Sequence, residues 1–300
     1  MSSNGNNSSR AFRPKATCIA SSGHRQPRHN KEYHMKTMGF IGCGNMGGAI
    51  IRSVAPAKKW QVLVHDVLEE TARALASETG AEYAPLDELL KTSDIVVLAV
   101  KPQILPDLYA TLRKHAGKQW ISMAAGISLE TLAAQLHTEQ VVRIMPNIAA
   151  SVKKAVTAVT PHPNADKTLI DTTMEFANLF GAAHRIDEKH FAAFIGVSGS
   201  AIATTFSFLH GIAMGGVHEG LPYTTALALI RDTVESATSL VRESKKHPEE
   251  LLTQVCSPGG LTIETMQVLY ENGFMGILME SVEAASQKAL ELELKAKTGN

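Results

Sequence analysis

Residues 38–49 read MGFIGCGNMGGA, and the order of residue types in this stretch decides the fold. The apolar run Met38–Ile41 predicts a strand, and Asn45–Val54 has the spacing of a helix. Between them lies a GxGxxG pattern with its glycines at Gly42, Gly44 and Gly47. In such a unit the first glycine allows a tight turn, the second lets a pyrophosphate approach, and the third lets helix and strand pack. The stretch predicts a dinucleotide-binding turn, with a purely structural glycine turn as the alternative.

The residues of this turn are the first expected contacts of a cofactor. The opening amides of a helix have no partner inside the helix and carry a partial positive charge, so they suit phosphate groups. The expected cofactor-binding residues here are Gly42, Gly44, Asn45, Met46 and Gly47.

Short apolar runs alternate with helical patterns from residue 36 to about 160. Further strands are expected at Gln61–His65, Ile95–Val100, Trp120–Met123 and Val141–Met145, with a helix at Glu69–Thr79. Strand–helix alternation with β-branched runs indicates a parallel sheet covered on both faces. The fold class is therefore α/β, with a Rossmann-type dinucleotide-binding domain over residues 35–186.

The strand patterns stop after about residue 186. Helices are expected at Phe191–His218, Thr224–Ser244, Pro248–Val255, Ile263–Tyr270 and Phe274–Leu292. Residues 187–300 are therefore expected to form a second, all-helical domain.

Asp66 ends the second expected strand, 24 residues after Gly42. A carboxylate there can accept hydrogen bonds from the 2′-hydroxyl of an adenosine ribose, and it would repel a 2′-phosphate. No Arg or Lys occurs from residue 66 to 72 to offset that repulsion, so the sequence favours NADH over NADPH. Asp66 also precedes a helix and could bind its first amides, and the two roles are compatible.

Composition excludes the simplest arguments for several other classes of protein. The 29 basic and 29 acidic side chains balance, so no basic surplus points to nucleic acid. Cys18, Cys43 and Cys256 are far apart, which argues against a disulfide framework or a zinc site. The 12 histidines show no metal-ligand spacing, and no metal is expected. Reduced thiols favour a cytoplasmic protein.

Residues 1–34 are rich in Ser, Asn, Arg and His and contain a single acid, Glu32. They have no apolar core of a secretory signal, so a disordered leader is expected. A transit peptide, an upstream start codon and a cloning remnant are alternatives, and Met35 would be a natural internal start.

No residue from Phe191 to Val217 carries a fixed charge, and this length could span a bilayer. The stretch contains Ser198-Gly199-Ser200 and His210, which fit a buried helix better than a membrane span. Exposed apolar patches of that size drive association, so an obligate homodimer with a helical interface is expected.

Several segments, taken in order, resemble the pyrroline-5-carboxylate reductase family. They are MGFIGCGNMGGA at 38–49, AVKP at 99–102, AAG at 124–126, RIMPN at 143–147, GVSGS at 196–200, and the His247-Pro248 to Thr262 segment with VCSPGGLT at 255–262. The resemblance covers about residues 36–290, and the segment ending at Thr262 is its most specific part.

The resemblance implies reduction of 1-pyrroline-5-carboxylate to L-proline by hydride transfer from NADH or NADPH. It implies that Thr262 assists protonation of the ring nitrogen, and that the substrate is bound by Ser257, Gly259, Gly260 and Ser200. Helix capping is the alternative role of Ser257 and Thr262. The resemblance further assigns to the cofactor site Val100, Lys101, Pro102, Ala125, Gly126 and Asn147.

This chain departs from the family pattern around the expected substrate site. The departures fall at Ala201-Ile202, Ile148-Ala149, Leu261 and Thr265. A related reductase with another imine or carbonyl acid as substrate is therefore one alternative, and a non-catalytic dinucleotide-binding regulator is another. Family members form dimers that build active sites between subunits and often assemble into larger rings. Neither a nucleic-acid partner nor a membrane is expected.

Overall fold

The computed structural model describes residues 35–115 and 117–298. The expected disordered leader, residues 1–34, lies outside these described residues. The described residues belong to one unit of the chain, which begins at Met35.

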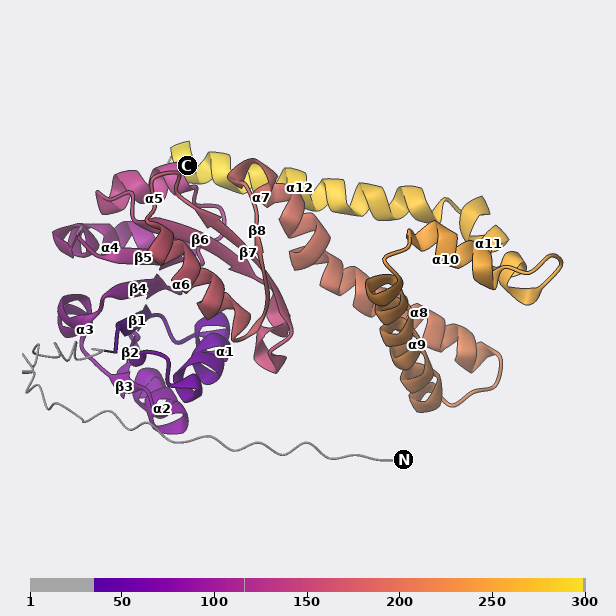
Figure 1. The fold of residues 1–300 in the computed structure, drawn as a ribbon, viewed down its shortest axis with the longest axis horizontal. Helices are drawn as coiled ribbons and strands as arrows, with labels where there is room; N and C mark the ends of the chain where they lie inside the picture. The colour runs from indigo at the N-terminus through magenta and orange to yellow at the C-terminus, as the bar shows by residue number, and fades with distance from the viewer. Residues whose placement is uncertain (1–34, 116, 299–300) are drawn as a thin grey trace, which may run out of the picture. The chain divides into compact units, whose positions relative to one another are not determined.

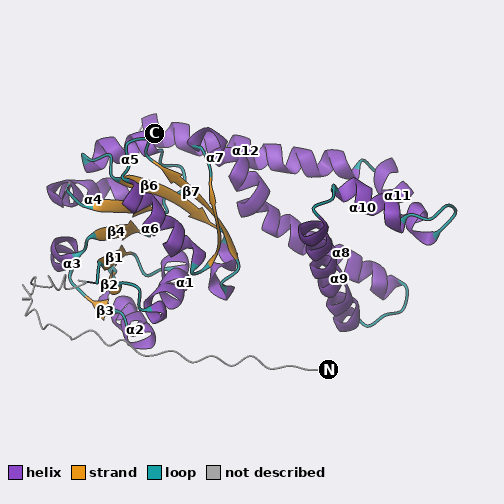
Figure 2. Ribbon diagram, viewed as in Figure 1, coloured by secondary structure: helices purple, strands orange, loops and turns teal. Residues whose placement is uncertain are grey.

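A single eight-stranded sheet in the order β3-β2-β1-β4-β5-β6-β7-β8 lies at the centre of the N-terminal half (Figures 1 and 2). The strands are β1 Thr37–Ile41, β2 Gln61–His65, β3 Glu82–Tyr83, β4 Ile95–Leu98, β5 Gln119–Ser122, β6 Val141–Pro146, β7 Ala155–Pro161 and β8 Gly181–Arg185. Neighbouring strands run parallel, except that β6 and β7 are antiparallel. The strand order reverses between β1 and β4, and open α/β sheets bind ligands at the carboxyl ends of strands at such a point.

Strand β4 illustrates why this sheet is covered on both faces. All four of its side chains are buried. Ile95 and Val97 belong to one apolar core, and Val96 and Leu98 belong to the other. Side chains alternate between the faces of a strand, so an unbroken apolar run requires a core on each side.

Helices on the two faces supply the rest of these cores. Those that cover the sheet or connect its strands are α1 Asn45–Val54, α2 Glu69–Thr79, α3 Leu86–Thr92, α4 Leu105–Leu112, α5 Leu129–Leu136 and α6 Lys167–Asn178. Buried side chains of α1, α2 and α6 join the core that contains Ile95, and those of α3, α4 and α5 join the core that contains Leu98. The expected Rossmann-type architecture is confirmed.

The sequence patterns did not predict three of the strands, β3, β7 and β8. Strand β3 has only two residues, and β8 has the sequence GAAHR with little apolar signal. Strand β7 is antiparallel to β6, which a continued βαβ alternation does not predict. The wholly parallel sheet expected from the sequence is therefore wrong at β6–β7.

The C-terminal part is helical. Its helices are α7 Phe191–Phe194, α8 Ala201–His218, α9 Tyr223–Ser244, α10 Pro248–Val255, α11 Leu261–Glu271 and α12 Phe274–Thr298. The single helix expected at Phe191–His218 is interrupted, because Ile195–Ser200 forms a π-helix between α7 and α8. Helix α12 packs against this π-helix and runs beyond the expected end at Leu292.

The π-helix and α8 lie within Glu188–His218, the one stretch among the described residues that is long and apolar enough to cross a membrane. In the single chain this helix is largely exposed, so its expected burial would have to come from the expected homodimer interface. Phe206, Ile212 and Met214 are exposed, and Ala213 is the fully buried residue of α8, packed with Ala226 and Ile230 of α9.

Candidate active site

The glycine-rich turn between β1 and α1 has the geometry that a bound pyrophosphate requires. Gly42 has φ of 107°, and a Cβ there would lie 2.7 Å from the carbonyl oxygen of Ala99. A Cβ at Gly47 would lie 2.3 Å from the carbonyl oxygen of Gly42. Gly44, the N-cap of α1, faces open space and makes no side-chain cap, so the opening amides of α1 are accessible to a phosphate.

Asp66 is fixed against this turn by two backbone amides. Its Oδ2 accepts from the amide of Cys43 at 2.7 Å, and its Oδ1 accepts from the amide of Leu68 at 3.0 Å. Leu68 precedes α2, so Asp66 orders the approach to that helix without contacting its first helical amides. Asp66 therefore binds the amide of the residue before α2, and not the first amides of the helix as the alternative role in capping predicted. Each carboxylate oxygen still has a lone pair for a further donor.

Cys43 lies under the carboxylate of Asp66. Burial, and to a smaller extent the negative charge of Asp66, raise the pKa of the Cys43 thiol from 9.0 to about 12. The thiol is therefore neutral at physiological pH, and it contributes to the core below the turn.

Two cavities, each of about 440 Å³, open beside the turn and share Gly44, Ala99, Val100 and Lys101. The first also contains Asn45 and Met46. The second is also lined by residues at the ends of β1 and β2 and by two residues from the helices after β4: Ile41, Gly42, His65, Asp66, Val67, Ile104 and Leu108. The structure thus brings together seven of the expected cofactor residues at the carboxyl ends of β1, β2 and β4: Gly42, Gly44, Asn45, Met46, Asp66, Val100 and Lys101.

The remaining expected cofactor residues do not line these two cavities. Pro102 begins a short 3-10 helix directly after Lys101. Ala125 is exposed in the loop after β5, and Gly126 has φ of 74° and faces Leu292 of α12. Met123, directly after β5, lines the first cavity, although no motif around it singled it out.

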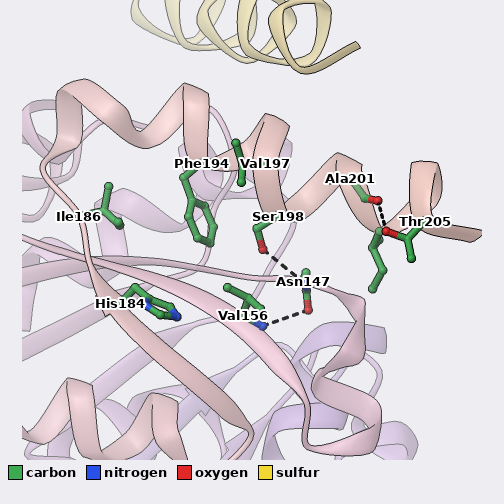
Figure 3. Close-up of a pocket in the computed structure, with 10 residues that line it drawn as sticks. Asn147, Val156, His184, Ile186, Phe194, Val197, Ser198, Ala201 and Thr205 are labelled. Atoms are coloured by element: carbon green, nitrogen blue, oxygen red, sulfur yellow. Dashed lines mark hydrogen bonds between the residues drawn. The ribbon is translucent and has the colours of Figure 1, made fainter. Parts of the chain in front are cut away.

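Asn147 lies in a separate cavity of about 410 Å³, between β7, β8 and the π-helix (Figure 3). Its Oδ1 accepts from the amides of Ala149 and Val156, and its Nδ2 donates to Ser198 Oγ at 3.4 Å. The side chain therefore ties the loop after β6 to the π-helix. A π-helical segment often marks a functional site, and this one places Ser198 in the cavity wall.

Two departures from the family pattern, Ala201 and Ile202, line the same cavity, together with Phe194, Val197 and Thr205. Ser200 adjoins the cavity at the end of the π-helix and is exposed. Ile148 and Leu261 are also exposed, at 64% and 90%.

The loop from Cys256 to Thr262 has the form of an anion-binding turn. Gly259 has φ of 66°, and the amide of Gly260 donates to the carbonyl of Ser257 at 3.0 Å. Gly260 is the N-cap of α11, and that helix has no side-chain cap. Within the described residues the hydroxyls of Ser257 and Thr262 have no hydrogen-bond partner, so their alternative role as helix caps is not what the structure shows.

The structure does not join this loop to the cofactor residues within one chain. Across the described part of the chain, no hydrogen bond, ion pair or cavity links residues 257–262 to the turn at Gly42 or to Asn147. Among residues 35–115 and 117–298, no three His, Cys, Asp or Glu side chains are grouped so that they could hold a metal ion.

Two family models match separate parts of the chain. Residues 188–292 match the one described as pyrroline-5-carboxylate reductase dimerisation. Residues 37–126 match the one described as NADP oxidoreductase, coenzyme F420-dependent. The second match covers the glycine-rich turn and both of its cavities.

Whole-length relatives agree with these matches. The chain is 36% identical to pyrroline-5-carboxylate reductase from Aquifex aeolicus, covering 85% of this chain and 97% of the relative. It is 35% identical to the Escherichia coli enzyme, covering 86% and 98%.

Solved structures give the same result. One of 1-pyrroline-5-carboxylate reductase from Streptococcus pyogenes has a TM-score of 0.75 at 29% identity, covering 85% of this chain and 98% of that one. One of Plasmodium falciparum pyrroline carboxylate reductase with NADP bound has a TM-score of 0.77 at 25% identity, covering 86% and 98%. This chain belongs to the pyrroline-5-carboxylate reductase family.

Proposed function

We propose that this protein reduces 1-pyrroline-5-carboxylate to L-proline with NAD(P)H, the last step of proline biosynthesis. Family membership over 85% of the chain supports the reaction. The observation that carries it is the bare glycine turn, with Gly44 facing open space beside two cavities. That turn fits a dinucleotide, whose nicotinamide supplies the hydride when it is bound.

The residues of this chain then have three tasks. Gly42, Gly44 and the first amides of α1 hold the pyrophosphate, and Lys101 lines the same cavity. Asn147, held by three hydrogen bonds, gives a rigid wall beside the reacting ring. Much of the rate enhancement comes from positioning, since hydride donor and acceptor must be held in near-attack geometry.

The loop at 257–262 recognises the substrate. The hydroxyl of Ser257 and the amides of Gly259 and Gly260 form the cradle for the substrate carboxylate, with Ser200 as a further polar contact. The unpartnered hydroxyl of Thr262 hydrogen-bonds the imine nitrogen. A hydroxyl is a weak acid, so a proton relayed from water through Thr262 completes the reduction.

A second copy of the chain completes this arrangement. The dimerisation domain, residues 188–292, supports a homodimer that takes a small-molecule substrate. The loop of one subunit would then approach the cofactor of the other. We place the domain boundary at residue 186 and the leader at 1–34, and we expect a cytoplasmic enzyme without nucleic-acid or membrane partners. We further propose that the dimers assemble into a ring.

One observation favours a second candidate function, the reduction of a related cyclic imine or carbonyl acid. Ala201 and Ile202, which depart from the family pattern, line the cavity around Asn147. A changed lining there would alter the ring that fits. A non-catalytic regulator is the third candidate, and the unpartnered Thr262 hydroxyl argues against it.

The decisive experiment is a steady-state assay with 1-pyrroline-5-carboxylate and with its six-membered homologue, for the wild type, Thr262→Ala and Thr262→Ser. Turnover of the five-membered imine, lost in Thr262→Ala and retained in Thr262→Ser, supports the proposal. Turnover of the six-membered imine alone favours the related reductase. Cofactor binding without turnover of any imine favours the regulator.

A further inference from the structure

Carboxylates gather where β2 passes into α2. Asp66 ends the strand and lines the cavity beside the glycine turn. Glu69 and Glu70 open α2, and both are exposed. Three acidic side chains thus occupy five consecutive positions at the edge where the adenosine half of a dinucleotide binds in this type of sheet.

Asp66 is held in one orientation by the amides of Cys43 and Leu68, at 2.7 and 3.0 Å. The neighbouring Val67 is 89% exposed and lines the same cavity, so an apolar surface for an adenine ring adjoins the carboxylate. A ribose placed between them would offer its hydroxyls to Asp66.

Two arginines, one on α1 and one on α2, are already engaged in ion pairs. Arg73 binds Glu69 at 2.6 Å and stacks over the ring of Tyr83 at 4.1 Å. Arg52 binds Glu78 through two bonds of 2.6 and 2.7 Å. Lys101 lines the cavity from the end of β4, which is two strands from β2 and therefore about 10 Å across the sheet.

We propose, on the basis that the chain is a nicotinamide-dependent reductase, that its preferred reductant is NADH and that Asp66, Glu69 and Glu70 exclude NADPH. A 2′-hydroxyl can donate to Asp66, whereas a 2′-phosphate can only accept and carries further negative charge. Like-charge juxtaposition of this kind is a strong source of discrimination. The matched solved structure from Plasmodium falciparum has NADP bound, so the fold itself does not exclude a 2′-phosphate.

The first test is binding of NADH and of NADPH to the full chain by fluorescence titration, without any imine. A preference for NADH of at least about tenfold in Kd is expected, which is about 1.4 kcal/mol. The preference should narrow at high salt, because exposed charges are screened. Equal or tighter binding of NADPH overturns the proposal, whatever the substrate of the enzyme proves to be.

Variants locate the selectivity. Asp66→Asn removes the charge but leaves the amide of Cys43 facing an Nδ2 donor, so this variant alone could disturb the turn. The double variant Glu69→Gln/Glu70→Gln keeps both bonds of Asp66 and frees Arg73, and it should raise the affinity for NADPH severalfold with little change for NADH. Glu78→Gln removes a carboxylate from the far end of the same helix and should leave the ratio of the Kd for NADPH to the Kd for NADH unchanged. If this Kd ratio is the same as in the wild type in both Asp66→Asn and Glu69→Gln/Glu70→Gln, the assignment of selectivity to these carboxylates is overturned.

Turnover separates this proposal from the proposed reaction. The ratio of kcat/KM for NADH to that for NADPH with 1-pyrroline-5-carboxylate should follow the binding ratio. Selective NADH binding with no turnover supports the proposed NADH selectivity and contradicts the proposed reduction of 1-pyrroline-5-carboxylate. Turnover that is faster with NADPH contradicts the proposed NADH selectivity and supports the proposed reduction of 1-pyrroline-5-carboxylate.

Discussion

The guanidinium of Arg143, which is fully buried in β6, donates to Oε1 of Glu188 at 3.0 Å. A second nitrogen of the same group binds Glu293 of α12, 150 residues further along the chain. The guanidinium also lies 3.8 Å from the centre of the Phe191 ring. Glu188 additionally accepts from the amide of Leu129, at the start of α5. One buried cation therefore fastens the last helix to the sheet, close to the loop that contains Gly126.

Arg143→Met should destabilise the folded protein by about 3 kcal/mol, because removing one partner of a buried charge network leaves the others unpaired. Glu188 and Glu293 keep some contact with water, which limits the loss. The measurement is urea unfolding at a fixed protein concentration. Arg52→Met removes an exposed pair with Glu78 and should cost no more than about 1 kcal/mol. Similar losses in the two variants would contradict the central place given to Arg143.

Gly196 in the π-helix lets α12 approach closely. A Cβ there would lie 2.7 Å from the carbonyl oxygen of Val282, which cannot move away without displacing α12. Gly196→Ala should therefore destabilise the protein by about 1–3 kcal/mol, as overpacking does elsewhere. Gly199→Ala is the matched control, since its nearest neighbour would be a side-chain atom of Ile195 at 3.7 Å. Thermal unfolding of the two variants distinguishes them, and equal midpoints would count against this account.

Local signals predicted much of the dinucleotide-binding half, and long-range contacts account for what they missed. The helices Asn45–Val54 and Glu69–Thr79 and the strand Gln61–His65 have the expected bounds, because their periodicity and their glycine boundaries are local. The antiparallel β7 depends on pairing with β6, which no local pattern specifies. The π-helix at Ile195–Ser200 likewise depends on packing against α12.

The candidate site divides in the same way. The GxGxxG spacing predicted a turn whose glycines have the required geometry. The bond from the Cys43 amide to Asp66 and the bond from Asn147 to Ser198 join residues that are distant in sequence, so spacing could not predict them. The network of Arg143 was missed for the same reason: the RIMPN segment drew attention to the residue, but its partners lie 45 and 150 positions away.

The thiol of Cys43 should make stability depend on alkaline pH. Its pKa in the folded protein, about 12, lies above the ordinary value of 9.0, so folding favours the protonated form. The resulting stabilisation is fully present below about pH 9 and is lost as the pH rises from 9 toward 12. Urea midpoints measured between pH 8 and 11 should fall less steeply in Cys43→Ala than in the wild type. Parallel slopes for the two proteins would show that the thiol does not contribute.

The difference in burial between Cys43 and Cys256 predicts a difference in their labelling by a thiol reagent. In a Cys18→Ser background at neutral pH, a thiol reagent should label Cys256, which is partly exposed, and spare Cys43, which is buried. Rapid labelling that survives in Cys256→Ser would contradict the burial of Cys43.

Association through α8 should be required for both stability and activity. Phe206, Ile212 and Met214 are 59%, 47% and 48% exposed in the single chain, and large apolar side chains grouped on one helix favour association. Met214→Glu would place a charge in that interface, where an unpaired charge is costly. Light scattering should show loss of the dimer, and the activity should fall by at least about tenfold, equivalent to about 1.4 kcal/mol. The matched control is Ala110→Glu, which adds the same charge to an exposed position of α4 and should leave both mass and activity unchanged. An active monomer of Met214→Glu would show that one chain contains a complete site, and the loop at 257–262 would then have to reach the cofactor of its own subunit.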